Sequence, residues 1–140
     1  MSAPVALGKR ATKQFCRLIK GMNFIPGEHR KLDNEPGLYM PCSIEVIGKG
    51  EDYTIISFSH YGEQNGDLMA DPDMTFLVMA GVVTQYTIYP MTFRNDYLGI
   101  YQESIEIDED GRKLIKPKQQ RDHTQFANTW MNNIVRQQGI

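Results

Sequence analysis

The sequence predicts an α+β domain in which an antiparallel meander sheet of five or six strands carries N- and C-terminal helices packed on one face. Helical periodicity appears near the two ends of the 140-residue chain, whereas the middle alternates with the two-residue period of strands. Connections between the strand-like segments are short, which favours antiparallel neighbours over parallel crossovers.

Length and composition fit one globular domain spanning residues 1–140, with residues 1–8 expected to be flexible. The hydrophobic fraction is 41% and the charged fraction 23%, both close to globular averages. No apolar run approaches the roughly 20 residues that a membrane-spanning helix needs, and the first residues lack the order of a secretory signal. We therefore expect a cytoplasmic protein without membrane contact.

The first helix is expected over residues 9–23, where apolar side chains recur every three or four positions. The opposite face of this helix holds five cations, namely Lys9, Arg10, Lys13, Arg17 and Lys20. Pro26 forbids further helix. Residues 26–37 contain two Pro-Gly pairs with mixed charge between them, which predicts a loop.

Alternation over residues 42–47 predicts a strand with Cys42, Ile44 and Val46 facing inward. Turn residues at 48–52 lead to a second strand over 53–61, rich in β-branched and aromatic side chains. Residues 62–71 are expected to form a polar loop. Residues 74–79 are apolar on both faces, which predicts a central strand.

A fourth strand is expected over residues 82–89, where Pro90 interrupts it or moves it to an edge, and residues 91–93 can resume it. A fifth strand covers 97–103 and can extend to 107, followed by an acidic turn at 108–111 and a short return strand at 114–115. The last helix is expected over 122–138, with Asp122 or Thr124 as its N-terminal cap and Gly139 ending it.

Three segments of the chain resemble a known protein family. Residues 64–76 read QNGDLM-A-DPDMTF, residues 95–103 read NDYLGIYQE, and the final helix runs from QFA through Trp130 to a closing QQG. Together they resemble an uncharacterised family of small bacterial proteins, a domain of unknown function often carried on plasmids, conjugative elements and phages. The resemblance spans residues 60–140. It implies a mobile-element context, in which small proteins often modify, bind or block host machinery, and it carries no activity.

Charge is distributed unevenly although the net charge is only −2. Residues 1–32 carry seven basic residues and one acid, residues 33–110 carry two basic residues and fifteen acids, and residues 111–140 carry six basic residues and one acid. Basic ends that pack beside an acidic sheet are one explanation. The other is a basic face for nucleic acid or an acidic partner, separate from an acidic face.

The most polar stretch runs from His60 to Phe76 and is the first place to look for a site. His60 with Asp67, Asp71 or Asp73 could bind a divalent cation and support metal-assisted hydrolysis. The spacing matches no strong metal motif. Turn chemistry explains the same residues: a left-handed turn at Asn65-Gly66 that Asp67 caps, and a strand that begins at Asp71-Pro72.

Two further groups of residues are explained first by structure. Gly99 lies inside the expected fifth strand, where a glycine marks a bulge or a close approach, for example to Trp130. Cys16 and Cys42 lack CxxC spacing and are expected to be reduced thiols, and no nucleophile motif accompanies them.

These observations lead to two hypotheses. The first is a small non-enzymatic binding protein of a mobile element that contacts a host protein or a ribonucleoprotein, or nucleic acid directly; countering host defence is one such activity. It needs neither cofactor nor metal, and homodimerisation stays open. Its basic contact face is the set of five helix cations. Its acidic contact face comprises His60, Tyr61, Glu63, Asp67, Asp71, Asp73, Asp96 and Glu103, with Tyr97 and Tyr101 beside them. The second hypothesis is the metal-assisted hydrolase.

Overall fold

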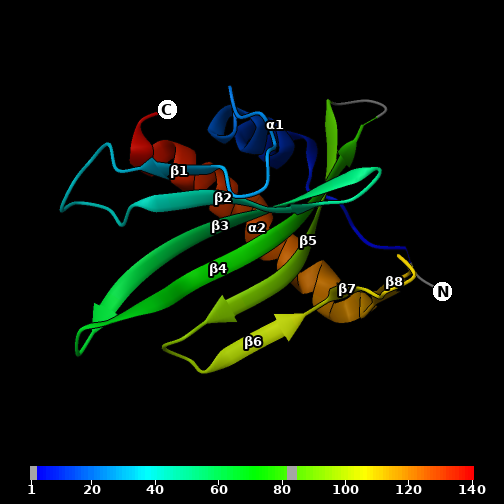
Figure 1. Ribbon diagram of the computed structural model, residues 1–140. Coiled ribbons are helices and arrows are strands. Elements are labelled where there is room, and N and C mark those ends of the chain that lie inside the picture. The colour runs from blue at the N-terminus through cyan, green and yellow to red at the C-terminus, as the bar shows by residue number, and fades with distance from the viewer. Residues whose placement is uncertain (1–2, 82–84) are drawn as a thin grey trace.

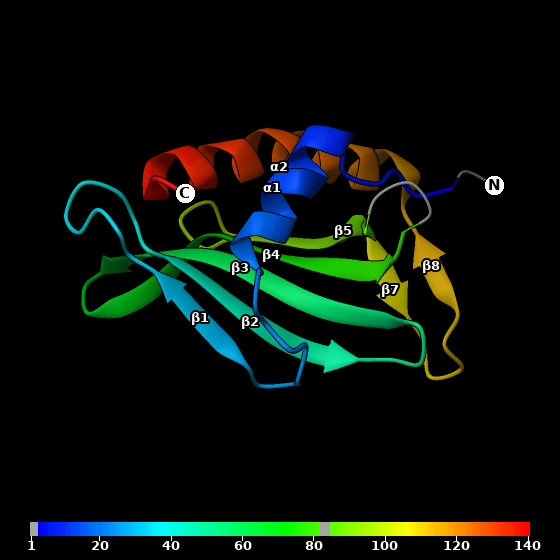
Figure 2. The ribbon, with the colours of Figure 1, turned by 90° about the horizontal axis from the view of Figure 1, so that it is seen from above.

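A computed structural model describes residues 3–81 and 85–140 and confirms the expected α+β architecture. Six antiparallel strands pair in chain order, and both helices lie on the same side of this sheet (Figure 1, Figure 2). The elements are α1 (Lys9–Leu18), β1 (His29–Leu32), β2 (Cys42–Lys49), β3 (Tyr53–Gln64), β4 (Asp67–Ala80), β5 (Tyr86–Asn95), β6 (Ile100–Glu103), β7 (Ile105–Ile107), β8 (Lys113–Ile115) and α2 (Pro117–Gln138). No helix in the described ranges is long and apolar enough to cross a membrane.

The main core lies between the two helices and the sheet. Phe15 of α1 is fully buried, and its ring packs 4.7 Å from that of Phe58 and 5.2 Å from that of Phe76, measured between centroids. Cys42, Ile44 and Val46 of β2 are also fully buried, as their alternation predicts. From α2 the core receives Ala127, Trp130, Met131, Ile134 and Val135.

A second, smaller core forms on the other face of the sheet at one end. Here the β7–β8 hairpin covers Leu77 of β4 and Met91 of β5, and Ile105 is its buried contribution. The hairpin confirms the predicted return strand and the acidic turn before it. It leaves the rest of that face uncovered, as the edge-on view shows (Figure 2).

The stretch 62–71, predicted to be a loop, is instead two paired strands. After a register shift between Ser59 and Tyr61, β3 and β4 stay paired to Gln64 and Asp67, and only Asn65 and Gly66 form the turn. Both turn residues have positive φ, 54° and 83°, as a two-residue hairpin turn requires. The prediction failed because this end of the hairpin extends beyond the helices (Figure 1), so polar side chains replace the alternation that marks a half-buried strand.

The prediction of a loop over residues 26–37 was also wrong, because this stretch contains the edge strand β1. Charged residues are common on edge strands, where they discourage pairing with another chain. Arg30 of β1 turns toward α1 and donates a hydrogen bond of 2.9 Å from Nη1 to the Leu18 carbonyl. This contact satisfies a free carbonyl at the end of α1, which stops at Leu18 rather than near Asn23; Gly21, with φ of 87°, lies just beyond this end.

Pro90 lies inside β5, which is an interior strand. The β4–β5 register shifts between Thr75 and Phe76, and β6 pairs only with Thr92–Asn95, so no strand partner is lost at Pro90. Residues 82–84, where this strand was expected to begin, lie outside the described residues.

Helix α2 begins five residues earlier than predicted, with Pro117 at its first position and Lys116 as the N-cap. Neither Asp122 nor Thr124 caps it. The polar residues of its first turns serve the N-terminal segment instead: the Gln120 side chain accepts from the Val5 amide at 2.7 Å, and Thr124 Oγ1 donates to the Val5 carbonyl at 2.8 Å. Leu7 in the same segment is buried. Gly139 ends the helix with φ of 66°, as predicted.

Candidate functional site

The uncovered part of the sheet, facing away from the helices, is here called the open face. Strand pairing arranges its side chains in two rows that each cross all six strands. Every residue in these rows is polar. The first row is His29, Glu45, Ser57, Thr75, Thr92 and Glu103, and the second is Lys31, Ser43, Ser59, Asp73, Arg94 and Tyr101.

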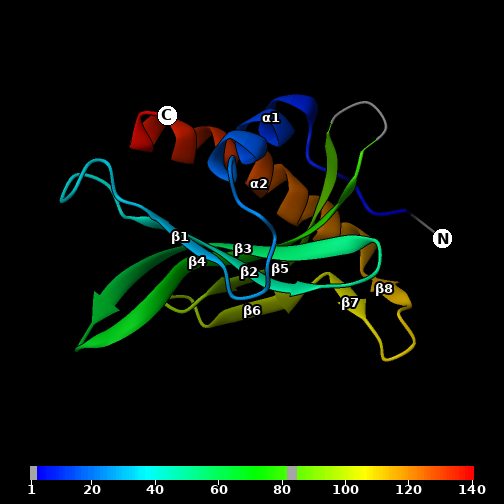
Figure 3. The same cartoon turned by 45° about the horizontal axis from the view of Figure 1, so that its top comes forward.

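Two of the motif segments, residues 64–76 and residues 95–103, meet at one end of this face. Asp96 Oδ2 accepts a hydrogen bond of 2.7 Å from the Ala70 amide, and the Asp96 amide returns one of 2.9 Å to the Ala70 carbonyl. Asn95 Nδ2 donates to Asp71 Oδ1 at 3.0 Å. The β5–β6 turn is thereby fixed to β4, and both lie at the same end of the molecule as the β3–β4 hairpin (Figure 3).

Asp73 is the carboxylate at the centre of the open face. It pairs across the sheet with Ser59 on one side and Arg94 on the other. Burial raises the pKa of Asp73 above its usual range, although hydrogen bonds from Ser59 and Tyr61 and the charge of Arg94 act in the opposite direction. A carboxylate whose charged form is disfavoured by burial and that faces a hollow is a typical feature of a binding site.

Asp96 has the opposite electrostatic environment. Arg94 Nε donates to its Oδ1 at 2.7 Å, and this bond, with the one from the Ala70 amide, lowers the pKa of Asp96 below its usual range. Arg94 is therefore ion-paired with Asp96, and its positive charge offsets the negative charge of Asp73 only in part. Asp96 holds the site together, whereas Asp73 is available to a ligand.

Two adjoining hollows follow the open face across the first four strands. One, of about 390 Å³, is lined by His29, Ser43, Glu45, Ile47, Ser57, Ser59, Tyr61, Leu68, Asp73 and Thr75. The other, of about 330 Å³, adds Lys31 and Pro41 and shares Ser43, Tyr61 and Leu68. Tyr61 is 39% exposed and Leu68 is 73% exposed. Because both side chains border both hollows, we treat the two as one groove.

The predicted acidic contact residues do not all share this face. Tyr61 and Asp73 line the groove, Glu103 lies on the open face outside the groove, on β6 beyond β5, and Glu63 is exposed near the hairpin turn. Asp67 also sits beside the turn, outside the groove lining. His60 points to the opposite side of the sheet, where its ring lies 5.4 Å from that of Trp130 and its Nδ1 is 3.0 Å from the Pro41 carbonyl oxygen.

This arrangement does not bring together the four residues of the metal hypothesis. His60 is 5% exposed on the helix side, Asp73 lies on the open face, and Asp67 is at the hairpin turn. Asp71 is the one member close enough to His60 to act on its pKa. Within residues 3–81 and 85–140, no group of three or more His, Cys, Asp or Glu side chains is placed to hold a metal ion.

Two smaller expectations also change. Gly99 lies in the β5–β6 turn with φ of 64°, and a Cβ atom added there would meet no other atom within 4 Å, so the glycine serves the turn and does not face Trp130. Both cysteines are free thiols. Burial raises the pKa of Cys42 to about 12, which leaves it protonated and unreactive at neutral pH.

The sequence interpretation missed Arg94 and the hydroxyl residues of the groove. A signal for them exists in β3, where Ser57, Ser59 and Tyr61 recur with the period of a strand and alternate with core residues. That pattern indicates a strand with one polar face. The content of β-branched and aromatic residues, from which this strand was predicted, does not reveal the polar face.

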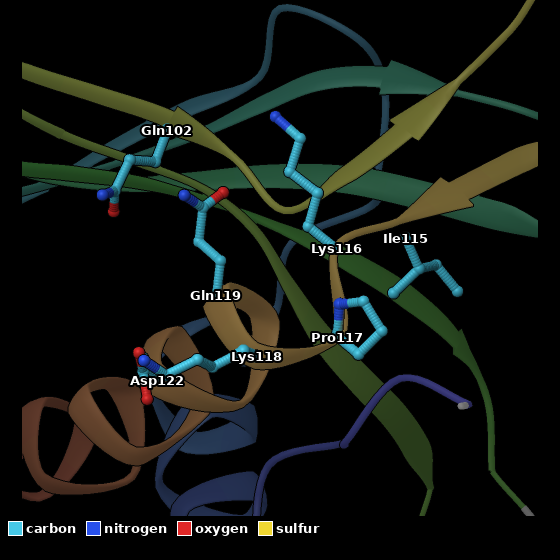
Figure 4. A pocket seen from close by; sticks show the side chains of 7 residues that line it. All are labelled: Gln102, Ile115, Lys116, Pro117, Lys118, Gln119 and Asp122. Carbon is cyan, nitrogen blue, oxygen red and sulfur yellow. The ribbon is translucent and has the colours of Figure 1, made fainter. Parts of the chain in front are cut away.

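A further hollow, of about 600 Å³, lies where α2 begins (Figure 4). It is lined by Gln102, Ile115, Lys116, Pro117, Lys118, Gln119 and Asp122. Behind it, a buried polar chain runs from Gln102 through His123 to Ser104, with contacts of 2.9 Å on both sides of the imidazole. Ser104 Oγ also donates to the Met91 carbonyl. These bonds connect α2 to β6 and, through Ser104 in the link between β6 and β7, to β5, so this row of hydrogen bonds has a clear structural role.

The five basic residues of the first helix lie away from the open face. Lys9, Arg10, Lys13 and Arg17 belong to α1, and Lys20 follows its last turn. All five are exposed or partly exposed. Because α1 packs on the opposite side of the sheet (Figure 2), the basic residues and the groove form two separate surfaces.

Comparison with known proteins gives one result. A family model described as "Domain of unknown function (DUF6908)" matches residues 12–140. Searches of curated proteins and of solved structures return no match. The match includes all three motif segments, nearly all of α1, the whole of α2 and all strands of the sheet, and the chain belongs to the DUF6908 family.

Proposed function

We propose that this chain is a non-enzymatic binding protein that contacts a partner protein through the groove on its open face. The observation that carries the proposal is Asp73 facing a groove with exposed Tyr61 and Leu68, close to Ala70 and Asp71, where the two motif segments meet. Tyrosine is enriched at protein interfaces, because its ring supplies apolar area and its hydroxyl a hydrogen bond.

Charge indicates the kind of partner. The acids on or next to the open face are Glu45, Glu63, Asp73, Asp96 and Glu103, against the cations Lys31 and Arg94, one of which is paired with Asp96. The excess of carboxylates favours a partner segment that presents lysine or arginine. A cation of the partner placed next to Asp73 would neutralise the part of its negative charge that Arg94 does not offset.

The biological setting is part of the proposal. The motif resemblance implies a mobile genetic element, in which such a protein would contact a host protein, alone or within a nucleic-acid complex, inside the bacterial cell. Countering a host defence is one outcome of that contact. The metal-assisted hydrolase is the weaker alternative, because Asp71 is the one of its three aspartates that lies close enough to His60 to act on the His60 pKa.

Affinity capture from a nuclease-treated bacterial lysate tests the proposal. The wild type, an Asp73→Asn/Glu103→Gln variant and a Lys13→Gln/Arg17→Gln control are compared, each pair of substitutions removing two charges. We expect host proteins captured by the wild type and by the control to be lost with the open-face variant. Equal capture by all three proteins would refute the assignment of the groove.

A second copy of this chain is the competing occupant of the groove. Light scattering across a concentration series distinguishes it. We expect the wild type to remain a monomer. A dimer that dissociates in the Asp73→Asn/Glu103→Gln variant would show that the groove serves self-association.

A further inference from the structure

The exposed cations of the N-terminal helix form a continuous basic surface. Lys9, Lys13 and Arg17 succeed one another at four-residue intervals along one face of α1, and Arg10 and Lys20 flank them. The rise from Lys9 to Arg17 is about 12 Å, which matches three to four phosphates at about 3.4 Å each along one strand of a duplex. This set of five residues is called the basic stripe below.

Nothing in the described chain neutralises this stripe. The ion pairs of residues 3–81 and 85–140 join Arg94 to Asp96 and Arg112 to Asp110. Glu28 is the one acid among residues 1–32, and its carboxylate accepts hydrogen bonds from the Asn23 and Ile25 amides instead. The stripe therefore keeps its full charge for a partner.

The second helix is also rich in cations. Together α1 and α2 carry seven cations and a single acid, Asp122. Lys9 and Arg10 also occupy the first turn of α1, where the helix dipole favours anions, and no acidic residue or side-chain cap is present there. Folding alone would favour acids at these positions, whereas binding of a polyanion makes use of both the cations and the dipole.

From this charge complementarity we infer that the basic stripe binds the phosphate backbone of nucleic acid. Phe15, the aromatic residue of α1, is fully buried, so no aromatic side chain on the described surface of α1 is available for base stacking and the contact is independent of sequence. The acids of the open face point away from this surface, which orients the molecule with the stripe toward the phosphates and the groove outward.

Fluorescence anisotropy with a labelled DNA duplex of mixed sequence measures this binding. Five phosphate contacts predict a slope of about −4.5 for log affinity against log salt, which is a loss of about 500-fold between about 50 and 200 mM salt. The Lys13→Glu/Arg17→Glu variant should bind more weakly and show a slope shallower by about two. Both positions are exposed, so its melting temperature should match that of the wild type.

The matched control is Lys49→Glu/Arg112→Glu, which changes the net charge equally at two positions of the sheet and the β7–β8 turn. It should keep the slope of the wild type. Absence of wild-type binding at low salt, binding that is insensitive to salt, or an equal loss in both variants would overturn the inference. Binding to heparin without binding to DNA would also overturn it, because it would show a general polyanion effect.

Discussion

At the scale of single residues, the open face places two carboxylates in opposite environments. Asp96 receives hydrogen bonds from Arg94 and from the Ala70 amide, which stabilise its charged form, whereas burial disfavours the charge of Asp73. The charge of Asp96 therefore stabilises the folded state, whereas the charge of Asp73 destabilises it. Residues that oppose folding at a solvent-facing groove are frequent at binding sites, because stability and function select different side chains.

Replacing these two carboxylates separates their roles. We expect Asp73→Asn to raise the melting temperature at pH 7, because a buried charge is removed while the hydrogen-bonding shape is kept. Asp96→Asn should lower it, because the charge that Arg94 and the Ala70 amide stabilise is lost. Thermal unfolding followed by circular dichroism measures both. A lower melting temperature for Asp73→Asn would contradict its assignment as a binding residue.

Buried histidines give a pH dependence. Burial holds the pKa of His60 and of His123 below the usual range, although Asp71 and Asp122 respectively act to raise them. The unfolded chain therefore takes up these protons at higher pH than the folded chain. The free energy of unfolding should be highest above about pH 6.5 and should fall as the pH is lowered through that value.

Urea unfolding at several pH values between neutrality and pH 5 measures this slope. The single variants His60→Gln and His123→Gln are the controls, since each should remove its own part of the slope whatever its overall stability. A free energy of unfolding that is constant or rises toward pH 5 in the wild type would contradict the prediction.

At the scale of elements, the β3–β4 hairpin depends on its two-residue turn. Gly66 has φ of 83°, where a side chain is strained, whereas Gly48 at the end of β2 has no positive φ and open space around it. Gly66→Ala should therefore cost about 1–2 kcal/mol of stability, and Gly48→Ala should change it by less than about 0.5 kcal/mol. Chemical denaturation of both variants tests the difference, and equal costs would contradict the turn geometry.

The same hairpin shows what the sequence can and cannot predict at this scale. Asn65-Gly66 correctly predicted a reversal of the chain, because few residues tolerate positive φ. The length of the strands was not predictable, because residues 62–71 lie beyond the helix layer and need no apolar alternation. Edge strand β1 and the first turns of α2 were missed for a related reason: their polar residues are specified by distant partners, Leu18 for Arg30 and Val5 for Gln120.

At the scale of the whole molecule, the chain separates charge between two layers. Helices at both ends and a meander between them were predictable from periodicity and short connections, and the uneven distribution of charge was visible in the sequence. The pairing of Asp73 with Arg94 was not, since it depends on a strand register that no local pattern specifies. We propose that the groove binds a protein partner and the basic stripe binds phosphates, on opposite sides of one sheet.

Site-specific photo-crosslinking tests the central claim most directly. The photoreactive residue p-benzoylphenylalanine is incorporated in place of Tyr61 in the groove and, in a separate protein, in place of Phe126 on α2; the two native side chains are 39% and 42% exposed. After irradiation in nuclease-treated bacterial lysate, we predict a discrete crosslinked protein from position 61 and none from position 126. Crosslinks from position 126 alone, or the same crosslinks from both positions, would contradict the claim that the groove on the open face is the partner-binding site.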